Sequence, residues 1–337
     1  MMKIKSVIFN PVFRLGLFCL SLVMGFNSCS LVWMDQEDCP EGVSLQFVYD
    51  HNMEFADAFN TKVHCISVLI FDENGNYVTT VEETSDALRR NDYRMNLDLE
   101  PGDYTLVTYG GHPCEDKSFN ITQFGTKSTD HISSLYAEME HDDFVSDDAK
   151  HDFYHGTHSF SIAAKKVSQE TVYLKKNTNN IRIVLQQMNG QAMSADDFTF
   201  EIIDDNSYMD HQNNVVPKGD ITYKPYASGQ VTVGTAEDGE TPVHAVYAEL
   251  STSRLTTETS PKLVIRSKTQ DKDVINIPLN TYLLLLKSEI YKDMSNQEYL
   301  DRESNWSVVF FLDPGHRWIN THILVNDWIV RLNDIGL

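Results

Sequence analysis

The chain has 337 residues, with 27 basic and 49 acidic side chains and a formal net charge of -22 at pH 7. So acidic a chain repels phosphate backbones and lacks a basic stripe, which excludes nucleic acid as a partner. Hydrophobic residues make up 41% and aromatic residues 11%, enough to bury a core, so the composition also excludes a disordered chain.

The N-terminal segment predicts an export signal that ends in a lipid attachment site. A basic start precedes a short apolar run over 15–26, which is too short for a permanent transmembrane helix of about 20 apolar residues. Cys29 follows this run, and its thiol can take a diacylglycerol as a thioether. The alternative is an ordinary secretory signal cut near Ser28. We expect a signal peptide over 1–28, a lipid on Cys29 and an acidic tether over 29–38.

Alternating apolar and polar residues predict a series of strands in the first half of the chain. These strands cover 43–49, 63–71, 77–81, 93–99 and 104–109. Asn74-Gly75 is a strong hairpin signal because both positions accept a positive φ. Residues 51–61 suit a helical turn, and the spacing of apolar residues predicts a helix over 126–143.

The second half repeats this style. Strands are expected at 171–174, 181–185, 198–203, 221–223, 230–233, 243–250, 262–266, 274–277, 306–312 and 323–332. Apolar residues at helical spacing predict an amphipathic helix over 279–293. Strands and turns at regular intervals predict a mainly β fold with a few short helices: two antiparallel β-sandwich domains, over 39–167 and 168–337.

The cysteines bound the covalent framework. Cys29 is assigned to the lipid, and Cys39, Cys65 and Cys114 remain in the mature chain. Three thiols permit at most one bridge and leave the pair open. Their spacing fits no zinc motif, and small buried or half-buried thiols are the favoured interpretation.

A histidine-rich and acidic run over 141–158 is the densest polar cluster. His151, His155 and His158 could share one face of a helix and ligate zinc. However, Gly156 interrupts them, and a solvated loop is the stronger interpretation. A metal-assisted hydrolase built on this run is the weakest of the function hypotheses.

No other pattern indicates catalysis. The alternating oxygen ligands of 204–210 lack the glycine of a calcium loop, since Met209 occupies its position, so a polar turn is expected. His64 and Cys65 are neighbours and would point to opposite faces of a strand. Four charged residues are expected to form ion pairs instead: Arg254, Asp301, Arg302 and Glu303. We therefore expect no catalytic residue, no metal and no cofactor.

Several phrases taken together resemble one family, and they run in order over roughly 37–332. They are Glu37-Asp38-Cys39-Pro40, Phe71-Asp72-Glu73-Asn74-Gly75, Leu99-Glu100-Pro101-Gly102-Asp103-Tyr104 before Tyr109-Gly110-Gly111, Ser251-Thr252-Ser253-Arg254-Leu255, Tyr299-Leu300-Asp301-Arg302-Glu303 and Val325-Asn326-Asp327-Trp328. With the lipidated start, they resemble the fimbrial anchor lipoproteins of Bacteroidetes-type pili. One departure is Phe26, which stands where the usual lipidation motif prefers an aliphatic residue.

The resemblance implies transthyretin-like sandwiches, a lipid-anchored place on the cell outer membrane, fimbrillin stalk subunits as partners and no small-molecule substrate. Fimbrillins of this type are thought to join by donor-strand exchange, a form of β-augmentation. The closing segment over 318–332 suits such an exchange strand or, the preferred interpretation, an ordinary last strand. Its apolar residues are Ile323, Val325, Trp328, Val330 and Leu332. A surface glycan-binding lipoprotein of a polysaccharide-uptake system is the alternative function.

Overall fold

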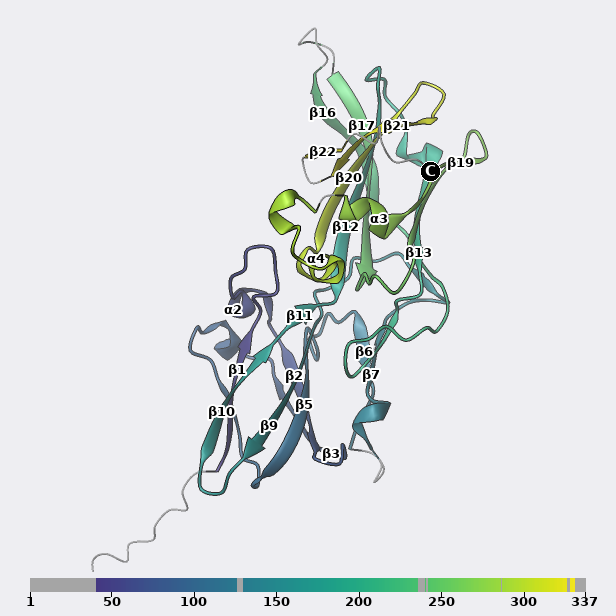
Figure 1. Ribbon diagram of the computed structural model, residues 1–337. Coiled ribbons are helices and arrows are strands. Elements are labelled where there is room, and N and C mark those ends of the chain that lie inside the picture. Colours follow the sequence, from purple (N-terminus) through teal and green to yellow (C-terminus); the bar gives the residue numbers. More distant parts are fainter. Residues whose placement is uncertain are drawn as a thin grey trace, which may run out of the picture.

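The computed structural model describes residues 41–125, 130–235, 240, 242–285, 287–325 and 328–330, and their side chains up to residue 319. In this part of the chain, strands form two β-sandwiches that follow one another along the long axis of the molecule (Figure 1). A small third sheet lies beside the first of them (Figure 1). The predicted fold class, mainly β and built of sandwiches with a few short helices, is confirmed.

The first sandwich stacks a three-stranded sheet, β10-β1-β4, on a five-stranded sheet, β11-β9-β5-β2-β3. Its strands are β1 Gly42–Val48, β2 Ile66–Asp72, β3 Tyr77–Glu83, β4 Met95–Leu97, β5 Gly102–Gly110, β9 Tyr154–Ile162, β10 Val167–Tyr173 and β11 Lys175–Lys176, with the short helices α2 Phe59–Lys62 and η1 Asp86–Arg89. Strand β1 pairs in parallel with β10, so the sandwich is not purely antiparallel. The expected domain boundary after residue 167 falls at the start of β10, which still belongs to this sandwich.

The second sandwich stacks a six-stranded sheet, β16-β17-β12-β20-β21-β22, on a five-stranded sheet, β19-β18-β13-β15-β8. Its strands are β8 Val145–Ser146, β12 Thr178–Gln187, β13 Phe198–Asp204, β15 Ile221–Tyr223, β16 Ala227–Thr235, β17 Pro242–Ser253, β18 Lys262–Ser267, β19 Lys272–Pro278, β20 Asn305–Leu312, β21 Trp318–Val325 and β22 Trp328–Val330. Strand β13 buries every second residue, as a strand with one face on a core must. Strand β12 pairs in parallel with β20.

The third sheet, β14-β7-β6, takes strands from both halves of the chain. They are β6 Phe119–Ile121, β7 Tyr136–Met139 and β14 Tyr208–Asp210. This sheet covers the outer face of β2, which explains why the first six residues of β2 are all buried. One face, with Ile66 and Val68, joins the core of the first sandwich, and the other, with Leu69 and Phe71, joins a second and larger core.

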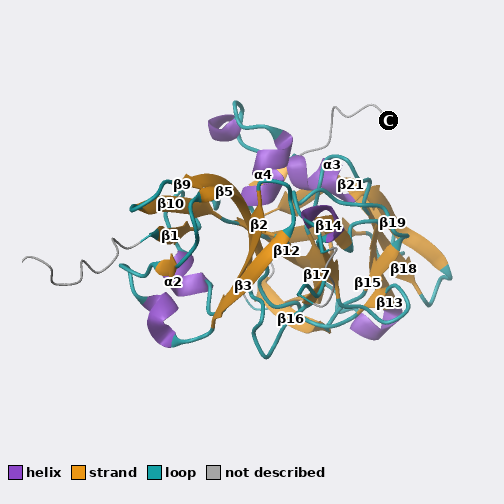
Figure 2. Ribbon diagram, turned by 90° about the horizontal axis from the view of Figure 1, so that it is seen from below, coloured by secondary structure: helices purple, strands orange, loops and turns teal. Residues whose placement is uncertain are grey.

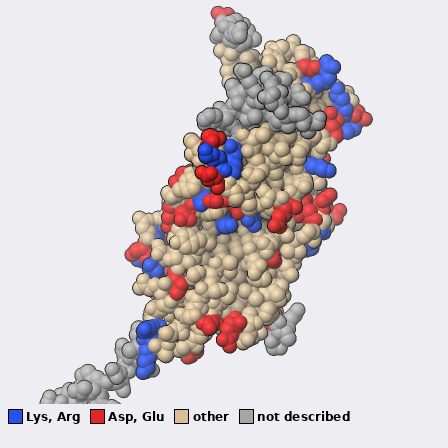
Figure 3. Space-filling model, in the orientation of Figure 1, with Lys and Arg blue, Asp and Glu red and all other residues tan. Residues whose placement is uncertain are grey.

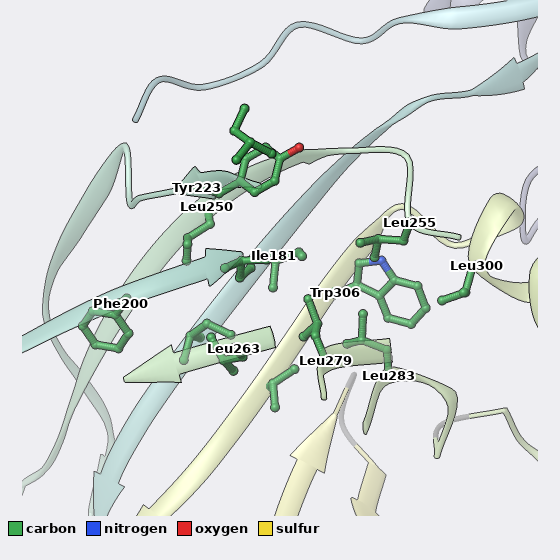
Figure 4. Packing of buried hydrophobic residues seen from close by; sticks show 14 of the residues in the cluster. Ile181, Phe200, Tyr223, Leu250, Leu255, Leu263, Leu279, Leu283, Leu300 and Trp306 are labelled. Atoms are coloured by element: carbon green, nitrogen blue, oxygen red, sulfur yellow. The ribbon is translucent and has the colours of Figure 1, made fainter. Parts of the chain in front are cut away.

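That larger core continues without a break into the second sandwich. Figure 4 shows part of it, with Trp306 of β20 packed among Leu255 and the leucines of α3 Leu279–Leu284 and α4 Asn296–Arg302. The Trp306 indole is 2% exposed and donates its Nε1–H to Asn179 Oδ1 at 3.2 Å. The core therefore joins the two halves into one packed body.

The observed helices differ from the predicted ones in extent and position. The described part of 126–143 holds only η2 Ile132–Ser134 followed by β7, so the predicted helix there is wrong. The predicted helix over 279–293 divides into α3 and η4 Glu289–Tyr291, and the helical turn expected over 51–61 lies at α2. In β7, Ala137 and Met139 face the core, and such a short apolar run does not distinguish a strand from a helix.

Cys65 and Cys114 form a disulfide bridge, with a sequence separation of 49 and their Cα atoms 5.6 Å apart. The bridge ties the start of β2 to the segment that follows β5. The interpretation of these two residues as small free thiols is wrong. The sequence had left the choice of pair open.

Candidate functional site

The joint between the sandwiches is built from strands that cross from one half of the chain to the other. Strand β14 pairs antiparallel with β7, and β15 pairs in parallel with β8. Above the first of these pairs, the rings of Tyr136 and Tyr208 stack with centroids 4.7 Å apart. Lys218 Nζ lies 4.5 Å from the Tyr208 ring and 2.6 Å from Glu138 Oε1. Main-chain ladders, and not a flexible linker, therefore connect the halves.

A buried ion pair lies at this joint. Arg254 holds Asp301 through two contacts, Nε to Oδ1 at 2.8 Å and Nη2 to Oδ2 at 2.9 Å, and the Asp301 side chain is 2% exposed. Burial alone would raise the pKa of Asp301, but the Arg254 hydrogen bonds and the positive charges of Arg254 and Lys175 hold that pKa below its usual value. This confirms the expected ion pair and assigns it a structural place.

Two buried asparagines complete this cluster. Asn177 Nδ2 donates to Asn213 Oδ1 at 2.6 Å, and Asn213 Nδ2 donates back to Asn177 Oδ1 at 3.0 Å. The Arg254 guanidinium donates to the Asn213 carbonyl. Buried amides without such partners would cost about 1–3 kcal/mol each, so the reciprocal pair specifies how the halves meet.

Helix α4 makes a second contact across the joint. Arg302 Nη1 donates to the carbonyls of Asp50 and Asn52 at 3.0 and 3.2 Å, and its guanidinium lies 4.5 Å from the Phe55 ring. Glu298 accepts from Arg302 Nε at 2.8 Å and orients it. Figure 3 shows charged side chains of both signs at mid-height, where the two halves meet.

A cleft of about 160 Å³ opens beside this contact, between the loop after β1 and the end of α4. Tyr154 OH donates to Asp152 Oδ2 at 3.0 Å, and Lys176 Nζ lies 2.7 Å from Asp152 Oδ1. Burial raises the pKa of Tyr154 and of Glu303. Within the cleft, Lys176 and Asp152 are paired with each other, as in a structural contact.

The structure separates the histidines that the sequence placed together. His155 and His158 lie on β9, so the expected loop is wrong from residue 154 onward. His155 is buried and within 3.0 Å of the His211 carbonyl through Nε2, while His158 is 2.8 Å from Glu170 Oε2. Within the described ranges no three His, Cys, Asp or Glu side chains gather as metal ligands.

The predicted C-terminal residues lie at the end of the six-stranded sheet. Ile323 and Val325 are in β21 and pair with Phe310 and Val308 of β20. Trp328 and Val330 are in β22, which pairs back onto β21. Leu332 lies outside the described residues, as do Cys29 and Cys39. Among the helices that the structure describes, none is long and apolar enough to cross a membrane.

The described chain thus has the architecture of a double β-sandwich protein, with strands shared between the sandwiches and a hairpin at its C-terminal end. The chain belongs to the family of fimbrillin-A associated anchor proteins Mfa1 and Mfa2, whose model matches residues 36–334. The resemblance seen in the sequence is thereby confirmed. Membership assigns the chain a structural role in cell-surface fimbriae. None of the curated proteins matches this chain.

Solved structures agree with this assignment. A candidate adhesin from Bacteroides thetaiotaomicron is 46% identical, with a TM-score of 0.83 over 89% of this chain and 100% of its own. A candidate polysaccharide-binding protein from the same organism is 29% identical, with a TM-score of 0.75 over 87% and 98%. The fimbrial anchor protein Mfa2 of Porphyromonas gingivalis shares the fold, with 14% identity and a TM-score of 0.64 over 87% and 99%.

Sequence reasoning missed most of the joint. Asn177 and Asn213 stand in polar stretches that give no sign of pairing, and β7, β8 and β14 are too short for a periodic signal. The phrases around Arg254 and Asp301 were singled out, but only as parts of a family pattern and as a nearby charge group.

Proposed function

We propose that this chain is a non-enzymatic lipoprotein of the outer membrane that anchors a fimbria, or forms a minor subunit of it. A diacyl chain on Cys29 holds the protein at the membrane, and a strand-mediated contact joins it to a fimbrillin stalk. Family membership over 36–334 is the observation that carries the proposal. The strand-built joint supports a load-bearing role, because main-chain ladders resist separation better than a few side-chain contacts.

The C-terminal hairpin is our proposed exchange element. Its residues Ile323, Val325, Trp328 and Val330 lie in the last two strands of the six-stranded sheet, where a short strand can be replaced at small cost. Deleting residues 318–337 tests this element. We expect copurification with the stalk fimbrillin to be lost while the rest of the chain stays folded, and intact copurification would refute this role.

Labelled palmitate and the variant Cys29→Ala test the anchor. We expect label on the wild type only, and we expect Cys29→Ala to leave the membrane and to release fimbriae. A protein that stays on the membrane without label, with fimbriae unchanged, would contradict the proposal.

Glycan binding is the second candidate function. The 29% identical structural neighbour, a candidate polysaccharide-binding protein, favours it. Tryptophan rings are common platforms for sugars, but Trp306 is buried in the core and has no face free for a sugar ring. Retention of the full-length protein on insoluble polysaccharide, abolished by free oligosaccharide, would establish this function.

A further inference from the structure

Strand β16 is an open edge of the second sandwich. It is 9 residues long and is the first strand of the six-stranded sheet, so within the described residues no strand lies on its outer side. Figure 2 shows it along the margin of the molecule. Such an edge presents unpaired main-chain groups and is a template for another strand.

The register identifies the free groups. Asn180 N–H donates to the Ser304 carbonyl, so alternate residues of β12 face β20 and the residues between them face β17. The residues of β17 that lie between those bonded to β12 therefore direct their main-chain groups toward β16. Their partners Ala227, Gly229 and Val231 direct their own N–H and C=O groups toward β17. The N–H and C=O groups of Ser228, Gln230 and Thr232 therefore point away from β17, the only strand in the described part of the chain that pairs with β16.

Natural edges of this length are usually guarded by charge, by proline or by a bulge. Strand β16 has neither a charged residue nor a proline in Ala227–Thr235, and its bulge comes only after Thr232. The edge strand of the other sandwich, β3, carries Glu82 and Glu83. The contrast indicates that β16 is kept open for a partner.

We infer that the edge Ala227–Thr232 accepts an extended, uncharged or basic segment of a stalk subunit by strand addition; this inference rests on the proposed function. A second copy of this chain is a poor occupant, since each carries a net charge of -22 and the two would repel. The edge also lies at the end of the molecule opposite Glu41, where the described chain begins (Figure 1), and thus away from a membrane-tethered N-terminus.

A recess of about 340 Å³ lies beside the start of this edge. Ser228 and Lys224 line one side of it, and Thr199 and Glu201 of β13 line the other. Asp147 adds a second carboxylate, so the recess suits a polar or basic side chain at one end of the incoming strand. On the opposite face, the Tyr247 ring lies over Gly229 and keeps the edge extended.

The test uses stalk fragments sheared from cells that make this protein, added to membranes carrying the full-length chain. The variant Gln230→Pro removes one outward N–H without touching the ladder to β17. It also removes the hydrogen bond from Gln230 Nε2 to the Met193 carbonyl, and Gln230→Ala, which loses only that side-chain bond, should bind the fragments as the wild type does. Thr80→Pro is the matched control, because Thr80 also has an outward N–H, on the edge strand β3. We expect Gln230→Pro to weaken binding of the fragments about tenfold and Thr80→Pro to leave it unchanged.

Hydrogen exchange on the wild type gives an independent reading that does not depend on how a variant folds. Bound stalk fragments should slow exchange at Ser228, Gln230 and Thr232. Binding without this protection, or equal binding by both proline variants, overturns the edge assignment and leaves the anchor function standing. Protection that rises with protein concentration in the absence of fragments identifies a second copy as the occupant and overturns it too. If the wild type binds no fragments, the anchor function falls together with the inference.

Discussion

The two sandwiches follow one plan but differ at their edges. In each, an early strand pairs in parallel with a late strand of the unit, β1 with β10 and β12 with β20. In the described part of the chain, β10 is the end strand of its sheet in the first sandwich, which also has charged side chains on its edge strand β3 and is tied by a disulfide. The second extends β20 by a hairpin and leaves β16 uncharged. The same strand arrangement thus serves one sandwich with a charged edge strand and one whose edge strand is free of charge.

Removing the disulfide should have the largest effect and should sharpen this comparison. For the double variant Cys65→Ala with Cys114→Ala, the chain-entropy model predicts a loss of about 4 kcal/mol for a loop of 49 residues. Guanidinium unfolding measures it, and reduction of the wild type should reproduce it. A loss below about 1 kcal/mol would show that the first sandwich does not depend on the bridge.

The ion pair at the joint should come next. Arg254→Ala leaves Asp301 buried without its partner, so we expect the free energy of unfolding to fall by about 3 kcal/mol. Arg266→Ala is the control, since Arg266 pairs with Asp271 and Asp273 in solvent and its loss should change little. Equal effects of the two variants would mean that burial at the joint contributes nothing.

Acid should weaken the molecule through His155. Burial lowers the pKa of His155 from 6.5 to about 4, so between these pH values the unfolded state binds more protons than the folded one. The stability that neutral, buried His155 contributes is therefore fully present above pH 6.5 and is lost as the pH falls toward 4. We expect His155→Gln to reduce the dependence of the melting temperature on pH over this range. His51→Gln should reduce it further, since burial lowers the pKa of His51 to about 4 as well. An unchanged slope in both variants would contradict this.

The smallest effect is expected at the first hairpin. Gly75 has φ +78, and a Cβ there would lie 2.6 Å from His131 Nε2, so Gly75→Ala should cost about 1 kcal/mol. Gly102→Ala is the control, because its nearest neighbour would lie at 3.5 Å. Thermal unfolding of the two variants checks this, and equal stability would show that the turn carries no strain.

The sequence pattern predicted those elements that depend on interactions between neighbouring residues. Asn74-Gly75 identified the turn between β2 and β3, and alternation identified β13 and β20, because each depends on neighbours in sequence. The joint was hidden because its parts are short and distant. Strand β7 exists as a strand through β6 and β14, and Asn177 meets Asn213 across 36 residues of sequence. Pairing partners that lie far apart leave no periodic signal.

The apolar interior that runs from Leu69 in one half to Leu312 in the other has a mechanical consequence. When the two ends are pulled apart, no flexible linker between the halves can extend. The force acts instead on the hydrogen-bonded strand pairs that join the halves, β14 with β7 and β15 with β8. The protein should therefore unfold under force as one unit and not as two separate domains, which is a useful property for a fimbrial protein under tension.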